Sequence, residues 1–201
     1  MNHRVLVGVL ALQGAFDAHV QRLTELGLES RLVKNTSDLV DLDGIILPGG
    51  ESTTMSNLLV TSDLGTELSK RLHDGLPVFG TCAGMIMMAR TIHDGRPDQI
   101  SLEAMDIQVR RNGYGRQNDS FELDISITSL DSPFHALFIR APVIETIGND
   151  VEVLASIDER PVLVRQASAL ASSFHPELVT DLRVHEIFLS IIHDSLTTSK
   201  R

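Results

Sequence analysis

After four residues the chain enters Val5-Leu6-Val7-Gly8-Val9-Leu10-Ala11-Leu12, a run without a polar side chain. A strand that is apolar on both faces is typical of a parallel sheet with helices on each side. Past Gly14 the apolar residues recur at helical spacing, and Gly27 then supplies a stop signal. Residues 28–34 can form the next strand. The opening of the chain therefore predicts a β-α-β unit.

The same alternation continues through the first half of the chain. Strands are predicted at residues 44–47 and 77–80, and helices at residues 53–60, 64–73 and 85–92. From about Ser101 short strands are predicted instead, at residues 105–110, 120–128, 134–140, 151–156, 162–166 and 169–174. A helix at residues 181–196 follows. The elements predict a three-layer α/β fold with a doubly wound, mixed, mostly parallel sheet, in one domain over residues 1–196 with a flexible tail at 197–201.

Composition limits the environment and the partners of the chain. The 201 residues carry a formal net charge of −10, which argues against a nucleic-acid partner because phosphates would be repelled. A single cysteine excludes an intramolecular disulfide and indicates a reducing compartment. The apolar run near the N-terminus is too short to span a bilayer and lacks a signal-peptide cleavage site. We therefore expect a cytoplasmic protein that has no contact with a membrane.

The cysteine lies in Gly80-Thr81-Cys82-Ala83-Gly84, between a predicted strand and a predicted helix. G-x-C-x-G is the cysteine counterpart of the nucleophile elbow, whose sharp turn leaves no room for side chains beside the nucleophile. A helix N-terminus favours thiolate over thiol, and the N–H of Ala83 would serve as an oxyanion donor. A lone cysteine is also commonly a small core residue. From the elbow alone, nucleophile and core residue are about equally good interpretations.

A cysteine nucleophile needs an imidazole base, and one histidine has a suitable setting. His175 follows an apolar strand, and Glu177 lies two residues further on across Pro176. The carboxylate could fix the tautomer and the orientation of the imidazole, as in other catalytic triads. The other histidines lie in terminal, polar or helical contexts, and His19 is interpreted as structural. H-P-E by itself is a weak signal, because many turns place proline beside polar residues.

A third motif is Pro48-Gly49-Gly50-Glu51-Ser52, which directly follows a predicted strand. Two glycines let the backbone approach a ligand, and the N–H of Gly50 could be a second oxyanion donor. Taken alone, the segment is better explained as a plain β-α turn in which Ser52 or Thr53 caps the helix. The segment lacks the Gly-Lys-Ser/Thr of a Walker loop.

Together the motifs resemble the class I (triad) glutamine amidotransferases, and more narrowly the glutaminase subunits of pyridoxal 5′-phosphate synthase. P-G-G, G-x-C-x-G and H-P-E indicate the superfamily. The narrower resemblance comes from L-Q-G-A, G-G-E-S-T, N-x-[YF]-G-R-Q and F-I-R-A-P. The matching segments span nearly the whole chain, at residues 8–15, 47–54, 80–84, 111–117, 120–122, 138–142 and 173–178. The resemblance implies a flavodoxin-like class I architecture.

The resemblance also implies an activity and a partner. It implies that glutamine is hydrolysed to glutamate and ammonia by a triad of Cys82, His175 and Glu177, without a metal or an organic cofactor. The ammonia would pass to a (β/α)8-barrel synthase subunit that makes pyridoxal 5′-phosphate. The implied glutamine-binding residues are Gly50, Glu51, Ser52, Arg111, Ile139 and Arg140. An arginine suits a substrate carboxylate, although surface ion pairs would explain Arg111 and Arg140 equally well.

Some features leave alternatives open. The family often has Glu before the histidine of the first helix, whereas Ala18 precedes His19 here, and Asp17 could supply a similar charge. Met85, Met87 and Met88 could flank an ammonia path, but core packing is the better explanation. The alternative functions are a glutaminase subunit of another synthase, such as imidazole glycerol phosphate synthase, or a non-catalytic binding or chaperone-like domain.

Overall fold

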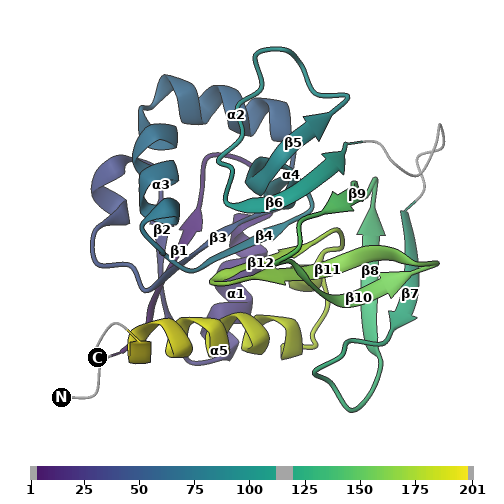
Figure 1. The fold of residues 1–201 in the computed structure, drawn as a ribbon. Coiled ribbons are helices and arrows are strands. Elements are labelled where there is room, and N and C mark those ends of the chain that lie inside the picture. Colours follow the sequence, from purple (N-terminus) through teal and green to yellow (C-terminus); the bar gives the residue numbers. More distant parts are fainter. Residues whose placement is uncertain (1–3, 112–119, 199–201) are drawn as a thin grey trace.

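The computed structural model describes residues 4–111 and 120–198 and shows a sheet with helices on both faces (Figure 1). The seven strands of this sheet are, in spatial order, β10 (Glu152–Ile157), β11 (Arg160–Gln166), β12 (Ala169–Ser172), β4 (Val78–Thr81), β3 (Gly44–Leu47), β1 (Leu6–Leu10) and β2 (Glu29–Val33). From β12 to β2 the neighbouring strands pair in parallel, whereas β11 and β10 pair antiparallel. The predicted mixed, mostly parallel sheet is confirmed.

Two helical layers cover the sheet. One face packs against α2 (Ser52–Thr61), α3 (Leu64–His73) and the short α4 (Ala83–Met88). The other face packs against α1 (Phe16–Glu25) and α5 (Arg183–Thr198). Figure 1 shows α2 and α3 on the side of the sheet away from α5. The fold is therefore the expected three-layer α/β arrangement.

The strand β1 shows why the opening run has no polar side chain. Val7 and Val9 point into the core beneath α1 and α5, while Leu10 points into the core beneath α2 and α3. Alternate residues of a strand face opposite sides, so a strand covered on both faces needs apolar residues at every position. All three of these side chains are fully buried.

Smaller sheets extend the fold beyond the central one. β5 (Ala89–His93), β6 (Met105–Arg110) and β9 (Val143–Ile147) form one, and β7 (Ser120–Ile125) pairs with β8 (Phe134–Ile139) in another. Short 3₁₀ helices lie at η1 (Thr36–Leu39) and η2 (Pro176–Leu178). No strand was predicted at β9, although its residues Val-Ile-Glu-Thr-Ile are rich in β-branched side chains.

The predicted helix over residues 85–92 is wrong in its second half. Helix α4 ends at Met88, and Ala89 takes an extended conformation with φ −64° and ψ 145°. From there β5 pairs in parallel with β6. Thr91 and Ile92 are β-branched and therefore suited to a strand, whereas the apolar run before them packs as a fully buried helix.

Other expectations concern the interior and the end of the chain. Met85, Met87 and Met88 are fully buried in the core between the sheet and α2, consistent with core packing. Helix α5 reaches Thr198, and residues 199–201, the rest of the expected tail, lie outside the described residues. Within the described residues, no helix combines the length and the apolar character needed to cross a membrane.

Candidate active site

Cys82 lies where β4 ends and α4 begins, on a strained turn. Its backbone has φ 49° and ψ −103°, a conformation that costs about 1–3 kcal/mol for a residue other than glycine. Two hydrogen bonds hold the turn: the N–H of Cys82 donates to the carbonyl of Ser172 (2.8 Å), and Ile86 N–H donates to the carbonyl of Cys82 (3.1 Å). The strand-turn-helix geometry predicted for G-x-C-x-G is present.

The glycines beside Cys82 are needed for close packing. A Cβ on Gly84 would overlap the carbonyl oxygen of Leu47 on β3, and a Cβ on Gly80 would overlap the sulfur of Met88. Helix α4 therefore approaches the sheet more closely than side chains would allow. The steric reason predicted for the flanking glycines is confirmed.

His175 and Glu177 form a buried pair directly after β12. Nδ1 of His175 lies 2.7 Å from Oε1 of Glu177, and the two residues are 6% and 2% exposed. The N–H of His175 donates to the carbonyl of Leu137 in β8 (2.9 Å), which ties this segment to the β7–β8 sheet. Glu177 itself belongs to η2, which starts at Pro176. The geometry matches a carboxylate that orients an imidazole.

The second ring nitrogen of His175 is directed to the cysteine side of the site. Nε2 of His175 is buried and has no hydrogen-bond partner of normal geometry among the described residues. Burial opposes protonation of this ring, yet the interactions with Cys82 and Glu177 prevail and raise the pKa of His175 to about 10. Gly49 lies against both catalytic candidates, because a Cβ there would overlap the His175 ring and contact Cβ of Cys82.

Glu177 remains a carboxylate despite its burial. Burial alone would raise its pKa, but His19 and the hydrogen bond from His175 outweigh that effect, so the pKa of Glu177 is lowered. A charged carboxylate can hold the N–H of a histidine and stabilise the imidazolium form.

A small pocket joins Cys82 to the residues that the family resemblance implied for glutamine binding. It has a volume of about 80 Å³. Its walls are formed by Cys82 and Ile86 together with Gly50, Glu51, Ser52, Arg111, Ile139 and Arg140. Every implied glutamine-binding residue thus lies around the cysteine, although these residues come from three separate segments of the chain. The carbonyl of Ile139 lies 3.9 Å from Sγ of Cys82.

Sequence reasoning missed Ile86 as a wall of this pocket. It lies four residues after Cys82, one helical turn along α4. That spacing was the available signal. The segment 112–117, which contributed to the family resemblance, lies outside the described residues.

The side chain of Glu51, in the wall of the pocket, has three partners. It is the N-cap of α2, accepting hydrogen bonds from the N–H groups of Thr53 (3.1 Å) and Thr54 (2.7 Å). Its Oε1 also lies 3.0 Å from Nη2 of Arg111. Burial opposes ionisation, but the hydrogen bonds from Thr54 and Thr53 together prevail and lower the pKa of Glu51 to about 2. The expectation that Ser52 or Thr53 caps this helix is wrong, because Glu51 has that position.

The glycine turn before Glu51 is held by the loop that follows β1. Ala15 N–H donates to the carbonyl of Gly49 (2.9 Å), and the side-chain oxygen of Gln13 accepts from the N–H of Glu51 (2.9 Å). Carbonyl and N–H of a trans peptide point in opposite directions. The bond to Ala15 therefore sets the direction of the Gly50 N–H.

Behind the triad lies His19, which sequence reasoning interpreted as structural. It is fully buried, and its Nε2 lies 3.5 Å from Oε2 of Glu177 and 3.2 Å from Oγ1 of Thr81. Asp17 lies in the first turn of the same helix, where we expected it to supply the negative charge that Ala18 lacks. Ala18 itself is half-buried. The neighbouring L-Q-G-A motif was a signal that this helix lies close to the site.

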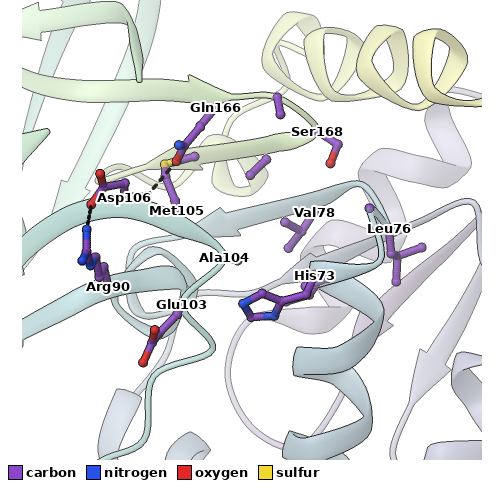
Figure 2. A pocket seen from close by; sticks show the side chains of 14 residues that line it. His73, Leu76, Val78, Arg90, Glu103, Ala104, Met105, Asp106, Gln166 and Ser168 are labelled. Atoms are coloured by element: carbon purple, nitrogen blue, oxygen red, sulfur yellow. Dashed lines mark hydrogen bonds and ion pairs between the residues drawn. The ribbon is translucent and has the colours of Figure 1, made fainter. Parts of the chain in front are cut away.

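A much larger pocket lies elsewhere on the chain. Its volume is about 590 Å³, and it lies at the amino-terminal ends of β4, β6 and β12 (Figure 2). Cys82, in contrast, follows the carboxyl end of β4. Figure 2 shows three of the polar residues of this larger pocket engaged with one another: Arg90 Nη1 lies 3.1 Å from Oδ1 of Asp106, and the side-chain oxygen of Gln166 accepts from the N–H of Asp106. Ligands of doubly wound sheets bind beyond the carboxyl ends of the strands. The small pocket at Cys82 is therefore the candidate site.

Within residues 4–111 and 120–198, no group of three or more His, Cys, Asp or Glu side chains is placed to hold an ion. The chemistry available at the pocket is that of a cysteine, an imidazole and a carboxylate.

A cysteine elbow, a His-Glu pair and a doubly wound sheet together define the class of the triad glutamine amidotransferases. The chain belongs to the SNO glutamine amidotransferase family, whose family model matches residues 9–194. It is therefore an enzyme of the glutamine amidotransferase type.

Known proteins similar to the chain agree with this assignment. A protein of Mycobacteroides abscessus named "Pyridoxal 5'-phosphate synthase subunit PdxT" is 54% identical over 187 residues, 93% of this chain and 97% of the relative. A protein of Kosmotoga olearia with the same name is 51% identical, and the match covers 92% of this chain and 97% of that relative. A crystal structure of a glutamine amidotransferase superposes with a TM-score of 0.88 at 47% identity. The match covers 93% of this chain and 98% of that chain. A putative GMP synthase subunit from Thermoplasma acidophilum, 18% identical with a TM-score of 0.73, shares the fold.

Proposed function

We propose that the chain hydrolyses L-glutamine to L-glutamate and ammonia and supplies the ammonia to pyridoxal 5′-phosphate synthase as its glutaminase subunit. The observation that carries the chemistry is the pocket in which Cys82 meets all six implied glutamine-binding residues. The synthase is inferred from the relatives of about 50% identity, which are named as subunits of that enzyme.

The pocket suits the charges of glutamine. The free amino acid carries one ammonium and one carboxylate group. Glu51 remains a carboxylate, because the hydrogen bonds at the start of α2 hold its pKa low, and can receive the ammonium group. Arg111 and Arg140 offer guanidinium groups for the substrate carboxylate. At about 80 Å³ the pocket is smaller than the roughly 300 Å³ at which ordinary ligand pockets begin. We expect glutamine to separate Arg111 from Glu51 as it enters.

In the first half-reaction the thiolate of Cys82 attacks the carboxamide carbon of glutamine. The N–H groups of Ala83 and Gly50 are assigned to the oxyanion, and both residues border Cys82 or its pocket. His175, protonated at neutral pH with its pKa near 10, gives its Nε2 proton to the leaving nitrogen. Ammonia departs and a γ-glutamyl thioester remains on Cys82.

In the second half-reaction His175 acts as a base. Part of the rise in its pKa comes from its interaction with Cys82, and thioester formation removes the negative charge of the sulfur. The pKa of His175 must then fall, which prepares the ring to take a proton from water. The resulting hydroxide attacks the thioester, glutamate leaves and the thiolate returns. Glu177 holds Nδ1–H throughout (2.7 Å).

The decisive experiment mixes the chain with a (β/α)8-barrel subunit of pyridoxal 5′-phosphate synthase and follows product formation with glutamine or with ammonium salt. We expect Cys82→Ala and His175→Asn to abolish the glutamine-dependent reaction and to preserve the ammonia-dependent one. Unchanged glutamine use by either variant would refute the triad. Transfer of ammonia only to an imidazole glycerol phosphate synthase partner would refute the assignment of the synthase.

A further inference from the structure

His19 links the two segments that carry the proposed triad. It lies on α1 and is fully buried. Its Nε2 is 3.2 Å from Oγ1 of Thr81, the residue immediately before Cys82, and 3.5 Å from Oε2 of Glu177. One ring therefore touches the nucleophile segment and the carboxylate segment at once.

The other side of the His19 ring has a defined partner in α5. Nε2 of His185 lies 3.1 Å from Nδ1 of His19, and His185 is also buried. Burial, reinforced by the neighbouring His19 and by Arg22, lowers the pKa of His185 to about 3. Burial likewise lowers the pKa of His19, against the opposing influence of Glu177. Both rings are therefore neutral at physiological pH, and each carries one N–H.

The hydrogen-bond partners select one arrangement of these protons. If His185 Nε2–H donates to His19 Nδ1, then His19 Nε2 carries its N–H towards Thr81 and Glu177. Nδ1 of His185, buried and without a hydrogen-bond partner among the described residues, is then an unprotonated acceptor. The reverse arrangement would bury an unsatisfied N–H on His185 and turn a lone pair of His19 towards a carboxylate. The first arrangement is therefore favoured.

Glu177 needs such a donor. Its Oε1 is held by His175, whereas its Oε2 is buried and has no hydrogen bond of normal geometry within the described residues. His19 Nε2 lies 3.5 Å from that oxygen. A buried carboxylate with one unsatisfied oxygen would lose part of its preference for the charged form.

We propose that His19 is a positioning residue for the amidotransferase reaction: its Nε2–H faces Oε2 of Glu177 and keeps this carboxylate charged and oriented towards His175. The proposal rests on the triad function proposed above. His19 does not line the glutamine pocket, so it acts through Glu177 and not on the substrate. The groups facing this carboxylate are His19 from α1, His185 from α5 and His175 from its own segment, with Arg22 further along α1.

The test compares two substitutions at one site. His19→Leu fills the space without a donor, whereas His19→Gln returns an N–H close to the position of Nε2. Leu23→Ala, at another buried position of α1, is the control for general loosening of that helix. Glutamine hydrolysis is measured in the complex with the barrel synthase subunit, and thermal unfolding is measured for every variant.

We expect His19→Leu to lower kcat roughly ten- to a hundredfold, as removal of a partner that orients a histidine does in metal sites. KM should change by less than about twofold, because substrate contacts persist. His19→Gln should recover most of kcat. If Leu23→Ala, matched for loss of thermal stability, lowers kcat as much as His19→Leu, or if His19→Gln is as slow as His19→Leu, the positioning role is overturned.

A second readout needs neither substrate nor partner. Cys82 is the one cysteine of the chain, so alkylation by iodoacetamide reports on it alone. An ordinary thiol is largely un-ionised at about pH 6 and largely ionised at about pH 10, so we expect the His175-Glu177 pair to assist the reaction at about pH 6 and not at about pH 10. We expect His19→Leu to lower the ratio of the alkylation rate at about pH 6 to the rate at about pH 10 about tenfold or more. An unchanged ratio would overturn the proposal.

The two proposals fail in different ways. If Cys82→Ala leaves glutamine hydrolysis intact, the triad function itself is refuted. If Cys82→Ala abolishes hydrolysis while His19→Leu keeps the wild-type kcat and alkylation ratio, the triad stands and the positioning role of His19 is refuted.

Discussion

Gly49 faces the imidazole of His175 so closely that a methyl group on its Cα would overlap Cε1 of the ring. The same methyl group would also contact Cβ of Cys82. From sequence, a plain β-α turn was the better explanation of this segment, and close approach of the backbone to a ligand was the alternative. Its first glycine instead leaves room for the proposed base beside the proposed nucleophile.

Gly49→Ala is therefore expected to displace His175 and to lower kcat for glutamine hydrolysis about a hundredfold, the cost of misplacing a catalytic group by about 1 Å. Gly27→Ala is the matched control. Gly27 has φ +71° and open space around its Cα, so alanine there should cost about 1–2 kcal/mol of stability without affecting kcat. Equal kcat values for the two variants would contradict the close packing against His175.

Glu51→Gln should affect both stability and substrate binding. It removes the charge that caps α2 and faces Arg111, so we expect a loss of about 0.5–1 kcal/mol at neutral pH and a higher KM for glutamine. Because the pKa of Glu51 is lowered from 4.5 to about 2, its extra stabilisation is present above pH 4.5 and is lost as the pH falls through 2. Unfolding of both proteins across this range checks the sign. Glu67→Gln, at an exposed ion pair on α3, should leave KM unchanged.

The protonated His175 should stabilise the folded chain in a defined pH window. Its pKa is raised from 6.5 to about 10, so the stabilisation is complete below pH 6.5 and is lost as the pH rises through 10. The difference in unfolding free energy between the wild type and His175→Asn should therefore shrink from pH 6 to pH 10. A difference that stays constant over this range would contradict the buried imidazolium.

Arg111→Lys and Arg140→Lys should each raise KM about tenfold, equivalent to about 1.4 kcal/mol, with a smaller change in kcat. Lysine keeps the charge but cannot present the planar pair of donors that suits a carboxylate. Steady-state kinetics with glutamine checks this. Arg165→Lys, whose partner is Asp194 outside the pocket, should behave as the wild type. An unchanged KM for both pocket variants would exclude a role of Arg111 and Arg140 in glutamine binding and leave surface ion pairing as their explanation.

Much of the fold could be predicted from the periodicity of apolar residues. Both faces of β1 are covered, as its uninterrupted apolar run indicates, and β6 has the predicted bounds. The failure at residues 89–92 has a physical cause: a short apolar run fits a buried helix or a buried strand equally well. Pairing with β6, which comes later in the chain, selects the strand.

The sequence by itself determined the elbow around Cys82, because its glycines and its place between strand and helix are local properties. It also determined the spacing of His175 and Glu177, which lie two residues apart. Only the tertiary structure decided that Arg111 pairs with Glu51 and that His19 reaches Glu177, since 60 and 158 positions separate these partners. Such contacts depend on strand order and helix packing, which bring distant segments together at the carboxyl ends of the strands. The elbow thus places the proposed nucleophile, and the assembled layers supply the groups that surround it.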